Sequence, residues 1–312
     1  MNVFHSISDY KNTESSVVTI GTFDGVHIGH KAIISQLLTA SEKEGLTSII
    51  LTFFPHPRMV IQEETSIKLI NTISEREELL QQTELENLII HPFTKEFSRL
   101  TALEFVRDIL VNQLHIKKLI IGYDHRFGRN REATIEDLFE FGKTYGFEVE
   151  EIKVQQFGGV PISSTKIRNI ILEGDITTAN NYLGQPFTLS GKIVSGRGIG
   201  KTITFPTANL QVEENYKIIP KKGVYLTQSE IEGKEIYGLT NIGTNPTVGG
   251  KHQTIETYFL DYKEDLYHKT IQLKFITRIR DEKVFKNTEE LKLAIKEDEV
   301  FARDFIFLSQ SR

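Results

Sequence analysis

The first half of the chain alternates short apolar runs with segments of helical periodicity, and this alternation limits its fold more than any other feature. The apolar runs lie at residues 16–20, 47–54, 87–93, 117–124 and 147–156. Apolar residues recur at helical spacing in 30–44, 74–83, 102–114 and 134–146. Ser74 with Glu77 predicts a capping box for the second of these helices. Strands that alternate with helices predict an α/β fold, in which helices flank a parallel sheet.

The second half of the chain has a different residue pattern. Residues 163–184 predict two short helices broken at Gly174 and Asp175. From residue 185 onward, β-branched residues, alternation and turn glycines predict a small antiparallel β-barrel, and the segment after Asn287 predicts a helix that closes it. A length of 312 residues suits two domains, which we place at 1–184 and 185–312.

Composition excludes several classes of protein. The chain has no Cys, which rules out disulfides, thiolate metal sites and a Cys nucleophile. Its net charge of −5 argues against bulk electrostatic attraction to nucleic acid. The start of the chain lacks the basic and apolar regions of a signal peptide, and no apolar run reaches the length of about 18 residues that spans a bilayer. We therefore expect a cytoplasmic protein that binds neither membrane nor nucleic acid.

The stretch GTFDGVHIGH, Gly21 to His30, joins the first predicted strand to the first predicted helix. A helix N-terminus offers unpaired N–H groups and partial positive charge, and glycines let a ligand approach the backbone closely. His27 and His30 can donate hydrogen bonds to phosphate oxygens there, more strongly when protonated. Two less favoured interpretations stay open: a buried structural pair, and a zinc site completed by Asp24 or His56.

A second segment, PISSTKIRNIILEGDITTANNYLG at 161–184, gathers hydroxyls and positive charge where a helix begins. That composition suits the phosphates of a nucleotide, although an ordinary N-capped basic helix would look similar. The loops that hold Gly21, Pro55 and Gly122 follow predicted strands. Such loops lie together beyond the carboxyl ends of a parallel sheet, so we expect the ligand site at that edge.

These two segments, with FFPHPRMVI at 53–61 and IGYDHRFGRNREAT at 121–134, resemble the N-terminal module of prokaryotic bifunctional riboflavin kinase/FAD synthetases. The resemblance implies a Rossmann-like nucleotidyltransferase domain, in which the terminal phosphate of FMN attacks the α-phosphorus of ATP and gives FAD and pyrophosphate. His125 departs from the family, which usually has Phe there. The HIGH string is shared with class I tRNA synthetases, but a synthetase is disfavoured because the barrel carries other motifs.

The resemblance also implies the residues of this first site. His27 and His30 would be catalytic. The implied ATP-binding residues are Gly21, Phe23, Asp24, His27, Gly29, His30, Ser163, Ser164, Thr165, Lys166 and Arg168. The implied flavin-binding residues are Pro55, His56, Pro57, Asp124 and Phe127. A phosphate monoester is already ionised at pH 7, so the reaction needs no general base and depends on positioning and charge stabilisation.

The barrel segment SGRGIGKTITFPTANLQV at 195–212 carries glycines followed by Lys and Thr, which suits either a phosphate cradle or a plain hairpin turn. Its FPTANL string resembles the P-T-A-N signature of riboflavin kinases, with Thr204 where the family usually has Gly. The strings GVY at 223–225 and NIGTNPT at 241–247 follow in family order. This resemblance implies that riboflavin is phosphorylated to FMN by ATP.

In this second site, the resemblance implies Glu256 as the base that activates the 5′-hydroxyl of riboflavin, and Arg280 as a flavin contact. Thr207 and Asn209 would ligate Mg²⁺ on ATP. The implied ATP-binding residues are Gly196, Gly198, Gly200, Lys201, Thr202, Thr207 and Asn209.

The implied small molecules are ATP, riboflavin, FMN and FAD, with Mg²⁺ as cofactor, and a weak homo-oligomer is left open. Two alternative functions remain. The chain could retain only one activity, with Thr204 and His125 as traces of the loss. It could instead bind flavin without catalysis.

Overall fold

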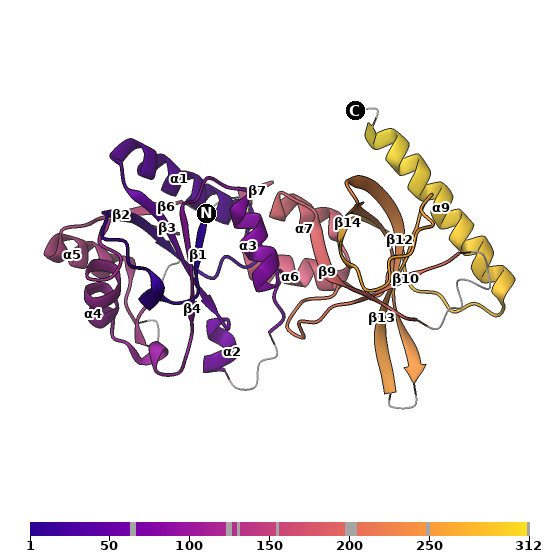
Figure 1. The fold of residues 1–312 in the computed structure, drawn as a ribbon, viewed down its shortest axis with the longest axis horizontal. Coiled ribbons are helices and arrows are strands. Elements are labelled where there is room, and N and C mark those ends of the chain that lie inside the picture. The colour runs from indigo at the N-terminus through magenta and orange to yellow at the C-terminus, as the bar shows by residue number, and fades with distance from the viewer. Residues whose placement is uncertain are drawn as a thin grey trace. The chain divides into compact units, whose positions relative to one another are not determined.

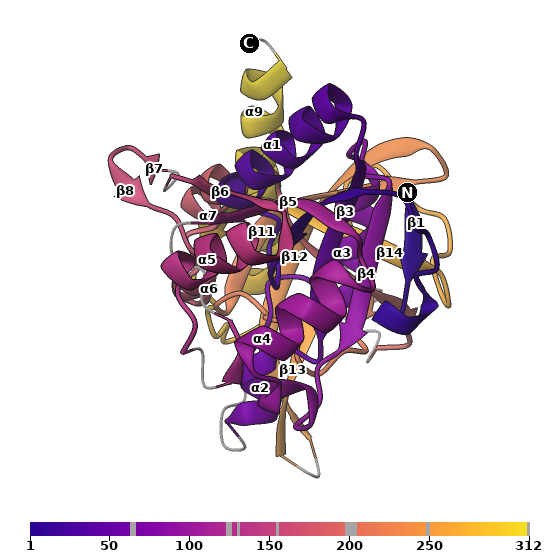
Figure 2. The same cartoon turned by 90° about the vertical axis from the view of Figure 1, so that its left-hand side faces the viewer.

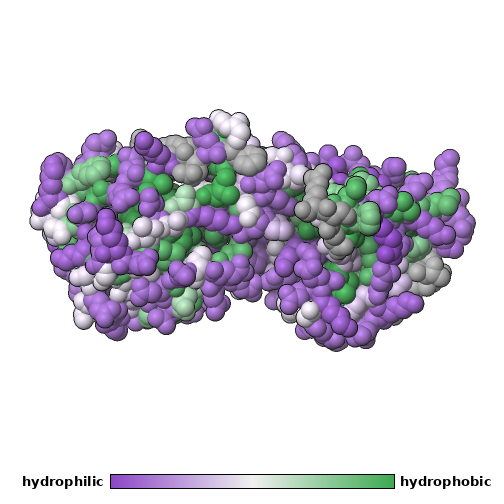
Figure 3. Space-filling view, turned by 90° about the horizontal axis from the view of Figure 1, so that it is seen from above, coloured by the Kyte–Doolittle hydropathy of each residue, from purple (hydrophilic) through white to green (hydrophobic). Residues whose placement is uncertain are grey.

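The computed structural model describes residues 1–62, 67–122, 127–129, 132–153, 156–196, 205–247 and 250–310. It divides into two compact units, Met1–Ser164 and Thr165–Arg312 (Figure 1), and each is described here by itself. Within the described ranges, every helix is too short or too polar to span a bilayer. The face of the molecule drawn in Figure 3 is largely hydrophilic, with scattered apolar patches.

The first unit is built on a parallel sheet, as predicted. Its strands are β1 (Asn2–Phe4), β2 (Ser16–Ile20), β3 (Thr47–Phe54), β4 (Asn87–Pro92), β5 (Ile116–Gly122) and β6 (Glu148–Ile152). Their order in the sheet is β1-β4-β3-β2-β5-β6, and all neighbours are parallel. Only β1 was missed, because three residues with no buried member form no apolar run. A small ribbon, β7 (Gln156–Phe157) with β8 (Val160–Pro161), follows the sheet.

Helices cover both faces of this sheet (Figure 2). They are α1 (Ile28–Glu44), α2 (Pro57–Ile61), α3 (Ile73–Gln81), α4 (Ala102–Glu104) with its wider continuation Phe105–Val111, and α5 (Ile135–Tyr145); short 3₁₀ turns occur at Ile7–Asp9 and Phe97–Arg99. Because β2 is buried on both faces, Val17 packs with α1 and α3 in one core, and Val18 packs with 105–111 and α5 in the other.

The predicted capping box of the second helix is wrong by two residues. Thr72, not Ser74, caps α3, and Glu75, not Glu77, closes the box: the Glu75 N–H donates to Thr72 Oγ1 (3.1 Å), and the Thr72 N–H donates to Glu75 Oε2 (2.9 Å). Both pairs have the same spacing, so the sequence pattern could not choose between them. Tertiary contacts to the residues just before Thr72 decided the start of the helix.

The second unit contains the predicted closed antiparallel barrel. Its strands are β9 (Phe187–Val194), β10 (Ala208–Gln211), β11 (Gly223–Ile231), β12 (Lys234–Thr247), β13 (Gly250–Phe259) and β14 (Thr270–Arg280), in the cyclic order β10-β13-β12-β11-β14-β9. The closing helix, α9, spans Thr288–Gln310. Its Ala302 packs with barrel residues, whereas Val300 and Phe307 are exposed.

Two helices precede the barrel, α6 (Ser164–Glu173) and α7 (Ile176–Leu183), with the predicted break at Gly174 and Asp175. The Asn180 side chain of α7 forms hydrogen bonds with the barrel. Its Nδ2 donates to Phe275 O (2.8 Å), and its Oδ1 accepts from the Phe187 N–H (2.7 Å). Apart from Ser164, both helices fall in the same compact unit as the barrel. The domain boundary predicted at residue 184 stays a prediction.

Candidate active sites

The site of the first unit lies at the carboxyl edge of the sheet. Strand β2 lies between β3 and β5 in the sheet. The chain runs from β2 to β3 and β4 on one side, and then crosses to β5 on the other side of β2. Ligands of open α/β sheets bind at such a switch point. The loop of residues 21–27 leaves β2 there and enters α1.

The two histidines of this loop are in contact. His27 is the N-cap of α1, and its Nδ1 accepts a hydrogen bond from the His30 N–H (3.3 Å). The two rings stack with centroids 3.6 Å apart and planes inclined by 16°. The Phe23 ring lies beside His30, with 5.0 Å between the ring centroids. The pair is therefore packed as one element at the N-terminus of a helix, where anions bind.

His30 is held in its neutral form. Burial, reinforced by His27 and by the positive charge of Arg76, keeps the pKa of His30 well below its usual 6.5. Its Nδ1 is buried and has no hydrogen-bond partner among the described residues. This low pKa leaves the His30 ring neutral at pH 7 in the unliganded protein, and the expectation that protonation strengthens phosphate binding stays a prediction.

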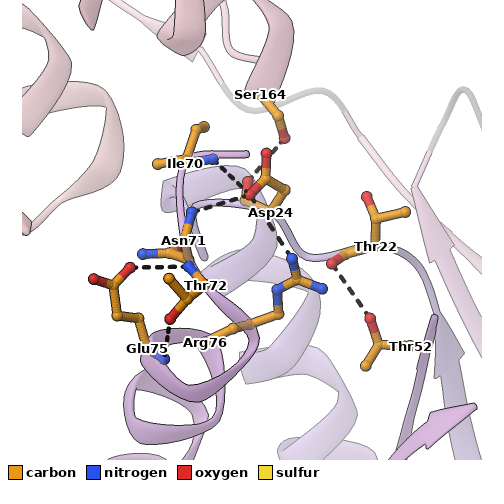
Figure 4. Close-up of polar contacts among 9 residues, drawn as sticks. All are labelled: Thr22, Asp24, Thr52, Ile70, Asn71, Thr72, Glu75, Arg76 and Ser164. Atoms are coloured by element: carbon orange, nitrogen blue, oxygen red, sulfur yellow. Dashed lines mark hydrogen bonds and ion pairs between the residues drawn. The ribbon is translucent and has the colours of Figure 1, made fainter. Parts of the chain in front are cut away.

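Asp24, predicted to bind ATP, has its carboxylate inside the protein (Figure 4). Its Oδ1 accepts from the N–H groups of Ile70 (2.9 Å) and Asn71 (3.2 Å) and lies 3.8 Å from Arg76 Nη2. Its backbone carbonyl accepts from Ser164 Oγ (2.9 Å). These bonds join the histidine loop to the segment before α3 and to the start of α6. They also fix the two residues that precede Thr72, the N-cap of α3.

The remaining residues of the 163–168 group have separate surroundings. Ser164 belongs to the first compact unit, whereas Thr165, Lys166 and Arg168 belong to the second. Arg168 is buried, and its Nη1 lies 3.5 Å from Thr165 Oγ1. Lys166 Nζ stands 5.7 Å from the centroid of the Tyr182 ring. The structure thus unites Ser164 with the histidine loop, and the roles of Lys166 and Arg168 stay predictions.

The predicted flavin-binding residues follow two strands, β3 and β5, that lie on either side of β2. Pro55, His56 and Pro57 follow β3, where the buried His56 caps α2 by accepting from the Arg58 N–H (3.1 Å). Phe127 is a core residue, with its ring 6.0 Å from that of Phe105. Asp124 and the unusual His125 lie outside the described residues.

The zinc interpretation finds no support. Among the residues that the structure describes, no three His, Asp or Glu side chains gather as a metal site would require. Asp24, which could have completed such a site, is bonded to backbone amides instead.

The site of the second unit is a row of polar residues across three strands. Glu256 on β13 lies opposite Asn209 on β10 and opposite Asn241 on β12. Directly opposite residues of antiparallel strands share a face of the sheet. Thr207 Oγ1 lies 3.4 Å from Glu256 Oε2. The structure therefore gathers the predicted base and both predicted Mg²⁺ ligands in one place.

Asn241 was not assigned to the site from the sequence. It is the first residue of the NIGTNPT string, and only the strand register shows that it faces Glu256. Gly196 was assigned, and it lies against the Asn209 amide: a Cβ there would lie 2.1 Å from Asn209 Nδ2 and would displace that side chain. Gly198, Gly200, Lys201, Thr202 and the unusual Thr204 lie outside the described residues.

Arg280, the predicted flavin contact of the barrel, forms an ion pair with Asp298 of α9. Its Nε and Nη2 donate to the two carboxylate oxygens of Asp298, both at 2.8 Å. Its guanidinium carbon stands 5.7 Å from the centroid of the Phe285 ring. A flavin contact would have to coexist with this ion pair, so the geometry favours a structural role.

Comparisons with known proteins agree with this division of the chain. Two family models match it, FAD synthetase over residues 9–166 and riboflavin kinase over 183–306. A bifunctional riboflavin kinase/FMN adenylyltransferase of Escherichia coli K12 is 37% identical over 298 residues, 95% of either chain. One from Listeria monocytogenes is 34% identical over 93% of this chain and 92% of its own. A solved structure described as a macrolide-efflux protein from Streptococcus pneumoniae matches with a TM-score of 0.89 at 30% identity, over 97% of this chain and 98% of its own.

Proposed function

This chain belongs to the family of bifunctional riboflavin kinase/FMN adenylyltransferases, and on that premise we propose that the N-terminal and C-terminal parts of the chain each carry one of two consecutive ATP-dependent reactions. The C-terminal part, which holds the barrel, phosphorylates riboflavin to FMN, and the N-terminal part transfers an adenylyl group from ATP to FMN. One observation supports this proposal above the others: the two family models match successive parts of the chain, and each part holds its own cluster of polar side chains.

In the kinase reaction, we assign Glu256 as the general base. The 5′-hydroxyl of riboflavin gives its proton to the carboxylate, its oxygen bonds to the γ-phosphorus of ATP, and the bond to the β-phosphate oxygen breaks to release ADP. Glu256 is partly buried, and Thr207 Oγ1 is 3.4 Å from it, so the carboxylate is held in one place.

The residues beside Glu256 fit Mg²⁺. Thr207 and Asn209 offer neutral oxygens next to a carboxylate, which is the donor chemistry that this ion prefers. Bound with ATP, Mg²⁺ would neutralise phosphate charge. The chain's own contribution is to hold the nucleotide, and Gly196 leaves room for the Asn209 amide to do so.

In the adenylyl transfer, the FMN phosphate attacks the α-phosphorus of ATP and pyrophosphate leaves, with no proton to remove. The N-terminus of α1 and the stacked pair of His27 and His30 stabilise the charge that moves onto the α-phosphate and the leaving group. A bound phosphate favours the protonated form of His30, so the site gains a positive charge when its substrate binds.

Three further points belong to this proposal. We keep the activity boundary at residues 184 and 185, close to residue 183, where the riboflavin kinase match begins. Cytoplasm is the proposed location, since both reactions consume ATP. Flavins and ATP are the proposed ligands, and the alternatives of one lost activity or of flavin binding without catalysis are outcomes of the test.

The test separates the two half-reactions. Wild-type protein is given riboflavin with ATP, or FMN with ATP, and products are separated by chromatography. Glu256→Gln is expected to slow FMN formation by about 10² to 10⁴-fold, the usual contribution of a general base, while FAD formation from FMN persists. Glu230→Gln, the same change at an exposed position on β11, is the matched control and should leave both rates unchanged.

Each outcome decides something. Failure of the wild-type protein to phosphorylate riboflavin would sink the kinase assignment, and failure to convert FMN would sink the adenylyltransferase assignment. Flavin binding without ATP consumption would favour a carrier. Loss of both activities in Glu256→Gln would contradict two separate sites.

A further inference from the structure

The loop that carries the two histidines has an unfavourable backbone. Phe23 and Val26 have positive φ angles of 48° and 39°, and Gly25 between them has 92°. Left-handed conformations cost non-glycine residues about 1 to 3 kcal/mol each, most for a β-branched residue such as Val, and persist only where surrounding contacts enforce them. Something must therefore hold this loop in the shape that ends at the His27 cap.

Asp24 is the residue placed to do so. It lies between Phe23 and Gly25, and both its side chain and its backbone carbonyl are bonded to other segments. The carboxylate is fully buried, so these bonds are made out of reach of water. A buried carboxylate is costly unless a positive charge and hydrogen bonds compensate it.

Arg76 supplies that positive charge. It stands in the first turn of α3, is 1% exposed, and approaches Asp24 Oδ1 to 3.8 Å. The capping box of Thr72 and Glu75 sets where α3 begins, and therefore where Arg76 points into the protein (Figure 4). The same guanidinium acts on His30, whose protonation it disfavours. One buried cation thus reaches both the loop anchor and one of the two histidines.

We propose that Arg76 and Asp24 form a clamp that holds the strained loop so that His27 and His30 stand ready for adenylyl transfer. Arg76 is a positioning residue in this scheme: it acts through Asp24 and the loop. Asp24, which the sequence assigned to ATP, is the anchor of the clamp. The inference rests on the proposed adenylyltransferase function of the first unit and adds the device that shapes its site.

The test compares Arg76→Gln, Asp24→Asn and the double variant with Arg107→Gln. Arg107 is a half-exposed arginine of the same unit, paired with Asp108, and serves as the matched control. Initial rates of FAD formation and of FMN formation are measured on each preparation. FMN formation, carried out by the other unit, reports whether the rest of the chain is intact.

Arg76→Gln and Asp24→Asn are each expected to lower kcat for FAD formation by about 10 to 100-fold, since a displacement of about 1 Å in reacting groups can cost that much. The double variant should lose no more than the worse single one, because both changes release the same clamp. FMN formation should stay within about twofold of wild type. Arg76→Lys, which keeps the charge, should recover part of the rate.

A purely structural loss is separated by nuclear magnetic resonance. In the folded population, the imidazole ¹⁵N signals of His27 and His30 should shift in Arg76→Gln and stay in place in Arg107→Gln. Unchanged imidazole signals, or losses that add in the double variant, would overturn the clamp. If wild-type protein forms FAD and Arg76→Gln matches it, the inference alone fails; if wild-type protein forms none, the proposed function has failed first.

Discussion

Arg280 offers a sharp choice between a residue that binds flavin and a residue that holds the fold. Its ion pair with Asp298 is bidentate, with the side chains 17% and 5% exposed. Removing one partner of a well-buried pair leaves the other charge without compensation, at a cost of about 3 to 5 kcal/mol. Because Arg280 keeps some solvent contact, we expect the lower end, about 3 kcal/mol, for Arg280→Met. At roughly 3 °C per kcal/mol for a unit of this size, the melting temperature of the second unit should fall by about 10 °C.

The assay is thermal unfolding followed by circular dichroism, with riboflavin KM measured well below the transition. Asp298→Asn should also destabilise the unit, and the double variant Arg280→Met/Asp298→Leu should be more stable than Arg280→Met, because it leaves no buried charge unpaired. Riboflavin KM should hardly change in any of them. The reasoning is refuted if Arg280→Met melts like wild type while its riboflavin KM rises, since the flavin role implied by the sequence would then be correct.

Three more predictions follow from single contacts. Gly196→Ala would place a Cβ 2.1 Å from Asn209 Nδ2 and displace that amide, so KM for ATP in FMN formation should rise by about tenfold with FAD formation unchanged; equal kinetics would contradict the close approach. Because the folded-state pKa of His30 lies below its usual 6.5, its contribution to stability is complete above about pH 6.5 and is lost as pH falls toward the folded value. ATP binding near pH 6 should therefore take up protons in calorimetry with two buffers, and His30→Asn should abolish most of that uptake. Asn180→Ala removes the three side-chain hydrogen bonds of Asn180 to the barrel and should destabilise the second unit by about 1 to 3 kcal/mol in denaturant unfolding, whereas an unchanged midpoint would argue against α7 as part of that unit.

Local patterns were enough for the architecture. Strands β2 and β3 were predicted to the residue, because each is a continuous apolar run bounded by a turn. The break between α6 and α7 was predicted from Gly174, which has a left-handed φ of 86°. The candidate residues of both sites came from motif strings, and the structure gathers Glu256, Thr207 and Asn209 as those strings implied.

Contacts between residues far apart in the chain could not be predicted from local patterns. Nothing in the sequence tells that Asp24 bonds to residues 70 and 71, or that Arg280 meets Asp298. Asn241 looked like one polar residue among several until the register of β12 and β13 set it opposite Glu256.

The sequence by itself determined the two architectures, their order and the residue types of two phosphate-handling sites, because periodicity, turn residues and motif spacing are properties of neighbouring positions. Only the tertiary structure decided the protonation of His30 and which charges serve the fold, namely Asp24 with Arg76 and Arg280 with Asp298. Those outcomes depend on burial and on distances between side chains that the folded chain alone brings together.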